Sequence, residues 1–164
     1  MNEGVSRQVY WLSVAAAVAL QLIQMPYGLA LFRPLLVAMV LAYWALADNH
    51  TTRLLAAWCT GVVIDVLTNS VFAQHALGFV LVVYVVKQFR TLITLFPLWQ
   101  AGAVMLPLWL LFTVVMFWID GATGHRADPW LRWLPPFTTP LFWPLIAGAL
   151  HGMHRGSQRD ASLL

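Results

Sequence analysis

The chain has few charged residues. Of its 164 residues, nine are Lys or Arg and six are Asp or Glu, so 9% are charged, whereas an average soluble domain has about 25%. Apolar residues make up 61% of the chain, and its mean hydropathy is +0.76. A domain of this length buries only about 70% of the surface of its unfolded chain. The composition therefore argues against a soluble globule and against disorder, and it predicts a protein whose main solvent is lipid.

Cysteine and basic clusters are also scarce. Cys59 is the only cysteine, so no disulfide can form within the chain. Its place in an apolar run predicts a small buried residue. The sequence pI is about 9.5, but no stretch gathers basic residues. The sequence therefore does not indicate a nucleic-acid partner.

Sequence motifs of catalysis are missing. The chain has no Walker loop, no His-Glu-x-x-His, no Gly-x-Ser-x-Gly and no Cys-x-x-Cys. His151 and His154 share a helical face, but two imidazoles without a third ligand make an incomplete zinc site. We therefore expect no catalytic residue, no cofactor and no metal, and we predict that the protein is not an enzyme.

Long apolar runs separate the few charges, and each run is a candidate membrane span. A spanning helix needs roughly 20 apolar residues, within a range of about 17–25. We predict one integral membrane domain over 1–164, all-α, with six spans of which several are short. The spans are 9–25, 34–47, 52–67, 73–89, 97–119 and 137–153.

Two alternatives to this count remain. The first span could be a cleaved signal peptide, but one Arg precedes it and Gly28-Leu29-Ala30 is a poor cleavage site. The third and fourth spans could be one long helix, although the turn-forming cluster Thr68-Asn69-Ser70 favours two.

The distribution of Lys and Arg distinguishes these topologies. With six spans and the N-terminus inside, six basic residues are cytoplasmic and three are outside. Merging the third and fourth spans changes that ratio to four against five. Because cytoplasmic loops are enriched in Lys and Arg, we predict that both termini lie in the cytoplasm.

Asp65 is the one acid that these boundaries place within a span. An ionisable side chain at the centre of a bilayer costs at least about 2.5 kcal/mol, so it is usually paired or functional. Gly61 lies four residues earlier, on the same helical face, and would let another backbone approach. We expect a structural pair or helix cap, for example with Arg33, and keep a subunit contact and transport chemistry as alternatives.

Three other features are candidates for structural or partner-binding roles. Arg33 precedes a short span and could extend to the outer headgroups, or form an ion pair or a partner contact. Segment 128–134 reads as a short interfacial helix, with Trp130 and Trp133 as aromatic anchors or as a grip on a partner or lipid. Gly148 and Gly152 permit close helix packing, for which we expect a site within the chain rather than a dimer.

Taken in order, several short motifs resemble the family of bacterial rod shape-determining proteins named MreD. The resemblance runs from about Tyr10 to Arg155. Its motifs are Trp11-Leu12-Ser13, Phe32-Arg33-Pro34, Tyr43-Trp44, Gly61-Val62-Val63-Ile64-Asp65-Val66-Leu67, Ala76-Leu77, Tyr84, Leu98-Trp99-Gln100, Phe117-Trp118 and Trp143-Pro144. The family often has glycine around Asn69 and Ala73, so a different turn is expected here.

The resemblance implies a non-enzymatic scaffold subunit of the cell-elongation machinery, the elongasome, in the bacterial inner membrane. Such proteins act with the single-span protein MreC and, through it, with MreB, RodA and a class B penicillin-binding transpeptidase in peptidoglycan synthesis. The resemblance also implies a fold like the S component of energy-coupling-factor transporters.

Two functions therefore remain. The first is a membrane scaffold that binds a single-span partner such as MreC. The second is a small-molecule or lipid-binding transport subunit with an outward-facing cavity, which would need converging polar groups such as Asp65 and Arg33. Membrane lipids are the one partner that the sequence predicts without the resemblance.

Overall fold

The computed structural model describes residues 3–23, 33–47, 52–70, 73–124 and 133–162, with the backbone alone for 3–6, 52–53 and 155–162. These residues form helices and contain no strand, which confirms the expected all-α class. The helices are α1 (Glu3–Leu22), α3 (Leu36–Ala47), α4 (Thr52–Thr68), α5 (Gln74–Gln88), α6 (Arg90–Thr94), α7 (Leu98–Val104), α8 (Leu106–Thr123) and α9 (Pro135–Ser162).

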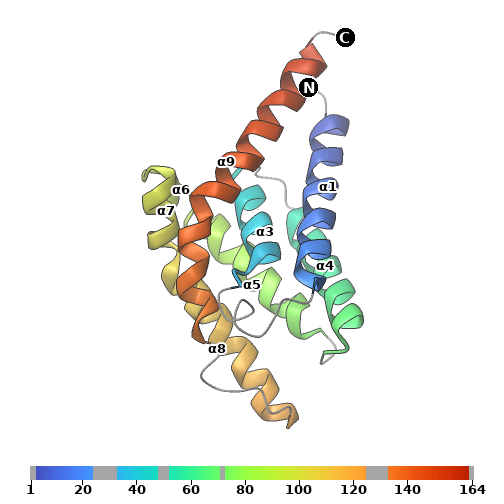
Figure 1. The fold of residues 1–164 in the computed structure, drawn as a ribbon, viewed down its shortest axis with the longest axis vertical. Coiled ribbons are helices and arrows are strands. Elements are labelled where there is room, and N and C mark those ends of the chain that lie inside the picture. The colour runs from blue at the N-terminus through green and yellow to red at the C-terminus, as the bar shows by residue number, and fades with distance from the viewer. Residues whose placement is uncertain (1–2, 24–32, 48–51, 71–72, 125–132, 163–164) are drawn as a thin grey trace.

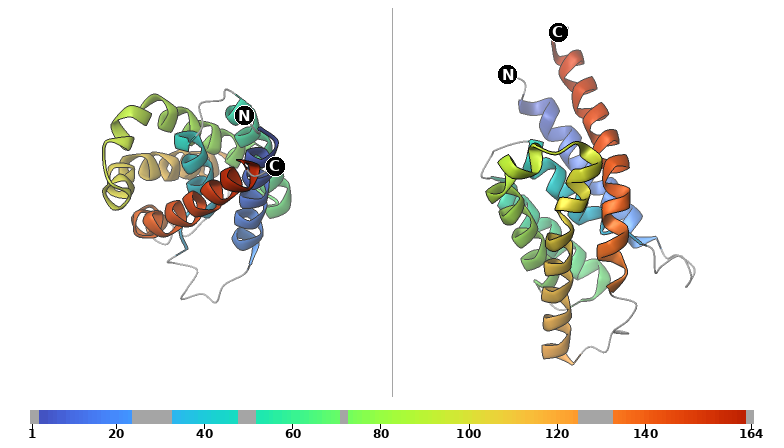
Figure 2. Two further views of the ribbon diagram at one scale, coloured as in Figure 1. Left: turned by 90° about the horizontal axis from the view of Figure 1, so that it is seen from above. Right: turned by 90° about the vertical axis from the view of Figure 1, so that its left-hand side faces the viewer.

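The long helices lie side by side in one bundle with two distinct ends (Figures 1 and 2). Helices α1, α4 and α8 finish at the end where α3, α5 and α9 begin. Both chain termini lie at the opposite end. We call the end away from the termini the distal end. Several helix termini therefore gather there, and their unpaired backbone groups need partners.

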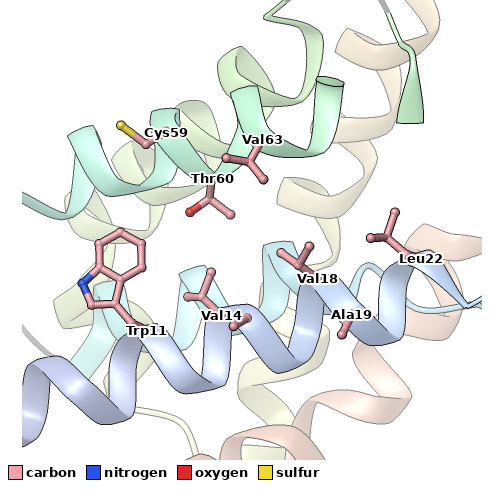
Figure 3. Close-up of a pocket in the computed structure, with 9 residues that line it drawn as sticks. Trp11, Val14, Val18, Ala19, Leu22, Cys59, Thr60 and Val63 are labelled. Carbon is pink, nitrogen blue, oxygen red and sulfur yellow. The ribbon is translucent and has the colours of Figure 1, made fainter. Parts of the chain in front are cut away.

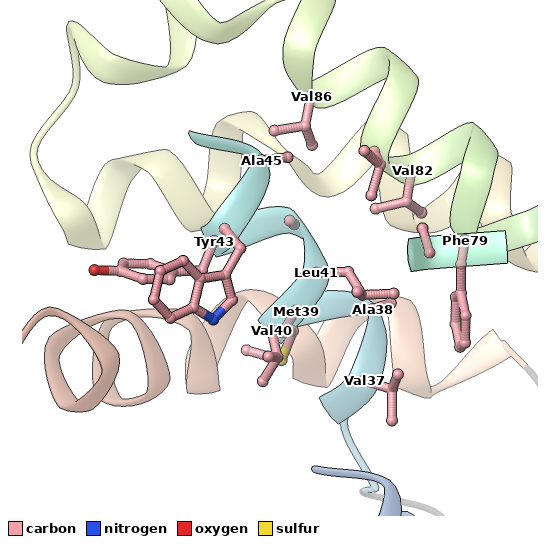
Figure 4. Close-up of a cluster of buried hydrophobic side chains, with 14 of the residues drawn as sticks. Val37, Ala38, Met39, Val40, Leu41, Tyr43, Ala45, Phe79, Val82 and Val86 are labelled. Carbon is pink, nitrogen blue, oxygen red and sulfur yellow. The ribbon is translucent and has the colours of Figure 1, made fainter. Parts of the chain in front are cut away.

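Helix α3 is the centre of the bundle. All residues from Val37 to Ala45 are buried, and the helix contacts α1, α5 and α9. Figure 4 shows its side chains facing Phe79, Val82 and Val86 of α5. A helix that is apolar on every side is stable only when other elements enclose it. Contacts with its neighbours therefore explain why α3 is stable although it has only 12 residues and is about 18 Å long.

One described helix is long and apolar enough to cross a bilayer unaided. That helix is α8, with 18 residues, while 36–47 and 54–68 are shorter apolar helices. The number of spans and their boundaries therefore stay predictions.

Two predicted segments differ from the helices observed. Segment 97–119, predicted as one span, is divided at Met105 into α7 and α8. Pro107 lies in the first turn of α8, which begins at Leu106, and a proline there removes no needed N–H group. Segment 137–153 is part of a longer helix, α9, which continues through Pro140 and Pro144 to Ser162.

Candidate functional site at the distal end

Polar side chains lie at the distal end, including polar residues that the sequence predicts to have structural or partner-binding roles. Helix termini leave N–H and C=O groups without partners inside the helix. In apolar surroundings each such group costs free energy unless another group binds it. The contacts described below show that side chains from neighbouring helices bind these groups.

Asp65 binds the first turn of the next helix. Its carboxylate accepts hydrogen bonds from the backbone N–H of His75, at 3.0 and 3.1 Å, and from that of Ala76, at 3.3 Å. The residue is 2% exposed. Ala73, which precedes α5, supplies no side-chain cap. Asp65 of α4 therefore caps α5 from outside, where its negative charge also complements the helix dipole.

Two side chains complete the surroundings of this carboxylate. The Ser70 hydroxyl donates to Asp65 Oδ1 at 2.7 Å, and His75 Nδ1 lies 2.7 Å from the same oxygen. Ser70 Oγ is 3.4 Å from His75 Nδ1. A serine nucleophile would have to give its proton to the imidazole. Here both groups face the carboxylate instead, an arrangement that orders the turn between α4 and α5.

Gly61 lets α5 come close enough for this cap. A Cβ atom at Gly61 would lie 2.2 Å from Cα of Ala76 and 2.3 Å from its nitrogen. Gly61 and Asp65 are one turn apart on α4. The missing side chain of Gly61 and the carboxylate of Asp65 therefore act at the same place, where α4 crosses α5. The α4–α5 pair has the most extensive helix contact in the described part of the chain.

The turn between these helices uses backbone conformations that favour glycine. Asn69 has φ 51° and Ala73 has φ 65°, both in the left-handed region. These are the places where the resemblance expects glycine. At these two positions the structure thus has residues with side chains in the left-handed region, which they adopt at a cost.

A second polar contact joins α5 to α8. Gln74 Nε2 donates to Asp120 Oδ1 at 2.8 Å, and the two residues are 3% and 8% exposed. The boundaries predicted from the sequence leave Asp65 as the one acid within a span and end the fifth span at residue 119, whereas in the structure α8 continues past this point and Asp120 is buried in it. The available signal was that Asp120 directly follows a long uncharged run.

Arg33 binds the end of α1 rather than Asp65. Its guanidinium Nη2 donates to the carbonyl oxygen of Leu20 at 2.7 Å and to that of Gln21. The expected pair between Arg33 and Asp65 is therefore wrong. A positive charge beside the last carbonyls of a helix satisfies them and complements the dipole.

Replacing Arg33 with glutamine is expected to lower the free energy of unfolding by about 1 kcal/mol, the usual net value of a partly exposed hydrogen bond. The measurement is unfolding in detergent micelles. Arg33→Lys is the control, because lysine keeps the positive charge and has N–H donors for the same carbonyls, so it should lose less stability than glutamine. A glutamine variant as stable as the original chain would contradict capping.

Helix α3 is capped in the same way by α9. The Thr139 hydroxyl accepts a hydrogen bond from the backbone N–H of Leu35 at 3.1 Å and donates to the carbonyl oxygen of Pro135 at 2.6 Å. Thr139 is fully buried. This contact could not be predicted, because nothing in the sequence indicates which helix lies beside Leu35.

The structure describes one of the two tryptophans of segment 128–134. Trp133 is partly buried, and its ring centroid lies 6.4 Å from that of Phe117 on α8. Trp130 lies outside the described residues. The interfacial helix therefore stays a prediction.

Gly148 and Gly152 do not mark a contact within the chain. A Cβ at either position would meet nothing within 4 Å, and both residues are exposed. The expectation of internal packing is wrong, because α9 turns a different face inward. That inner face carries Trp143, Ala147 and Leu150, all buried.

An apolar groove lies between α1 and α4. Its volume is about 370 Å³, and Trp11, Ala19 and Thr60 are among its lining residues. Cys59 also lines it and is exposed, so the expectation that Cys59 is buried is wrong. Asp65 and Arg33 do not line this groove.

The distal polar residues thus act on the chain's own backbone. No group of three His, Cys, Asp or Glu side chains suited to a metal occurs among the described residues. Asp65, Arg33 and Thr139 each bind the end of a helix. The arrangement holds short helices in register, and it leaves the outward surface largely apolar.

Comparison with known proteins is consistent with this organisation. The chain matches the family described as rod shape-determining protein MreD over residues 4–151. It is 22% identical over 130 residues to the rod shape-determining protein MreD of Haemophilus influenzae, a match that covers 79% of this chain and 80% of that relative. No solved structure gives a significant match, so a fold like that of transporter S components stays a prediction. Because the family match extends over nearly the whole sequence, the chain belongs to the MreD family of rod shape-determining proteins.

Proposed function

We propose that this protein is a non-enzymatic scaffold subunit of the bacterial cell-elongation machinery. In this proposal it crosses the inner membrane six times with both termini in the cytoplasm. It binds a single-span partner such as MreC, which connects it to MreB, RodA and a class B penicillin-binding transpeptidase. Membership of the MreD family supports a role in rod shape, and the following observations support the finer parts.

The helix arrangement supports the multi-pass topology. Both termini lie at one end of the bundle (Figure 1), as six crossings require. The capped helix ends gather at the other end, where the Lys and Arg count predicts the outer side. Helix α3 is short, but its central residues, Val37 to Ala45, are buried among α1, α5 and α9, so other helices enclose most of its length.

The outward face of α9 is the observation that carries the scaffold proposal. Gly148 and Gly152 lie open on this face, and Leu141 and Leu145 continue it at 76% and 69% exposure. Membrane helices associate through small residues that allow two backbones to approach. We call Leu141, Leu145, Gly148 and Gly152 the α9 seam, and we assign it to the partner's membrane helix.

The described residues offer no site that matches the alternative, a transport subunit. Such a function needs converging polar groups in a cavity. Asp65 and Arg33 bind backbone groups of the chain itself and do not line the groove between α1 and α4. The scaffold is therefore the better account of this geometry.

Filling the α9 seam tests this proposal. In the double variant Gly148→Leu with Gly152→Leu, we expect MreC to be lost when the chain is purified from membranes in mild detergent. The physical reason is that two leucines prevent close approach of the partner's backbone. The quantity measured is the amount of MreC recovered per amount of this chain.

Gly121→Leu is the matched control. A Cβ at Gly121, like one at Gly148, meets nothing within 4 Å, but Gly121 lies on α8. The control should recover MreC at the original level. Equal recovery with the double variant, at equal thermal stability, would contradict the proposed role of the α9 seam.

A further inference from the structure

The groove between α1 and α4 has the shape of a channel open to the bilayer. Figure 3 shows the two helices side by side, with Trp11 and Cys59 near one end and Leu22 near the other. From Trp11 to Leu22 the helix rises about 17 Å. That length is about half of a hydrocarbon core of ~30 Å, which is the depth of one leaflet.

Few polar groups line this groove among the described residues. The Thr60 hydroxyl, which lines it, donates to the carbonyl oxygen of Ala56 at 2.8 Å. Besides the indole N–H of Trp11 and the weakly polar thiol of Cys59, the other lining side chains are apolar. Apolar cavities of about 150 Å³ stay dry and bind small hydrocarbons. A groove of about 370 Å³ is therefore suited to a longer hydrocarbon.

The length and the lining of the groove favour an acyl chain as its occupant. The groove follows about three turns of α1, which is close to the depth of one leaflet. Its lining is almost entirely apolar, so the hydrocarbon chain of a lipid matches both the length and the chemistry of this space.

Positive charge lies at the Trp11 end of the groove. Arg7 is one turn before Trp11 on α1 and is exposed, with no hydrogen bond or ion pair to the described residues. Tryptophan is typical of the headgroup level of a bilayer. An anionic headgroup would thus meet complementary charge directly above the groove.

We propose that the groove between α1 and α4 holds one acyl chain of an anionic phospholipid whose headgroup lies against Arg7. The occupant belongs to the leaflet that faces the N-terminal ends of α1 and α4. This site rests on the placement of the bundle in a membrane that we propose above, but it does not involve the α9 seam.

Native mass spectrometry of the full chain in mild detergent tests the site. The probes are phosphatidylglycerol and phosphatidylethanolamine with identical acyl chains. The original chain should retain phosphatidylglycerol in preference. Arg7→Gln should lower its retention about fivefold, the effect of one basic residue near an anionic lipid. Ala19→Phe, which fills the groove, should remove both lipids.

Leu12→Phe is the matched control. Leu12 is 66% exposed on α1 but does not line the groove, so this variant should retain lipid like the original chain. Equal retention of the two lipids by the original chain would overturn the anionic headgroup. The acyl-chain site would be overturned if Ala19→Phe retained as much lipid as the original chain. It would also be overturned if Ala19→Phe released a single-span protein instead of lipid. Ala19→Phe should leave MreC recovery unchanged, so this test and that of the α9 seam can fail separately.

Discussion

Asp65→Ala is expected to lower the free energy of unfolding in micelles by about 3 kcal/mol. The variant leaves the Ser70 hydroxyl and the backbone N–H groups of His75 and Ala76 without their acceptor. Each buried donor without a partner costs about 1–3 kcal/mol.

An opposing effect reduces this loss. Removing an ionised carboxylate from an apolar site recovers its desolvation cost, which is about 2.5 kcal/mol or more at the centre of a bilayer. Asp65 lies in the last turn of α4, so the desolvation free energy recovered there is smaller than for a residue at the centre of the bilayer. The cost of leaving three donors unsatisfied is larger than this gain, and the substitution is therefore destabilising.

Asp65→Asn is the matched control for shape. Asparagine keeps one carbonyl oxygen for the α5 amides, and it is a good helix cap. It should lose roughly half as much stability as alanine, because its NH₂ group cannot accept a hydrogen bond. An alanine variant that unfolds like the original chain would contradict the capping role, and so would an asparagine variant that is less stable than the alanine variant.

Gly61→Ala is expected to cost about 3 kcal/mol or more. The new Cβ would lie 2.2 Å from Cα of Ala76, whereas carbon atoms at optimal contact are about 3.5–4.0 Å apart. The obstacle is backbone, so α4 and α5 must separate by more than 1 Å, beyond ordinary overpacking of about 1–3 kcal/mol. That movement also lengthens the hydrogen bonds from α5 to Asp65.

Gly148→Ala is the matched control for this substitution. Its Cβ meets nothing within 4 Å, and alanine favours a helix over glycine by about 0.5–1 kcal/mol. The two variants should therefore change stability in opposite directions. Combining Gly61→Ala with Asp65→Ala should cost less than the sum of the two, because both act on one crossing. Additive effects would show that the glycine and the carboxylate act separately.

Hydropathy and charge predict much of the fold. The uncharged runs predicted an all-α protein, and Thr68-Asn69-Ser70 favoured two helices where the structure has α4 and α5. The break at Met105 could not be predicted, because Pro107 is compatible with either a bend within a helix or the start of a new one.

The candidate site could be predicted in kind but not in its pairings. Asp65 was expected to cap or pair because a carboxylate in apolar surroundings needs partners. Which partner it binds depends on the helix that lies beside it, and no pattern in the sequence distinguished His75 from Arg33. Gly61 and Gly148 look alike in sequence, yet only Gly61 faces another helix.

Photo-crosslinking from the α9 seam tests the scaffold account most directly. A photoreactive phenylalanine derivative replaces Leu145, which is 69% exposed, or Leu77 of α5, which is 54% exposed. Both changes exchange one large exposed side chain for another. After irradiation of intact membranes, we expect a covalent product with MreC from position 145 and none from position 77. A product from position 77 alone, or none from position 145, would contradict the assignment of the α9 seam to the partner.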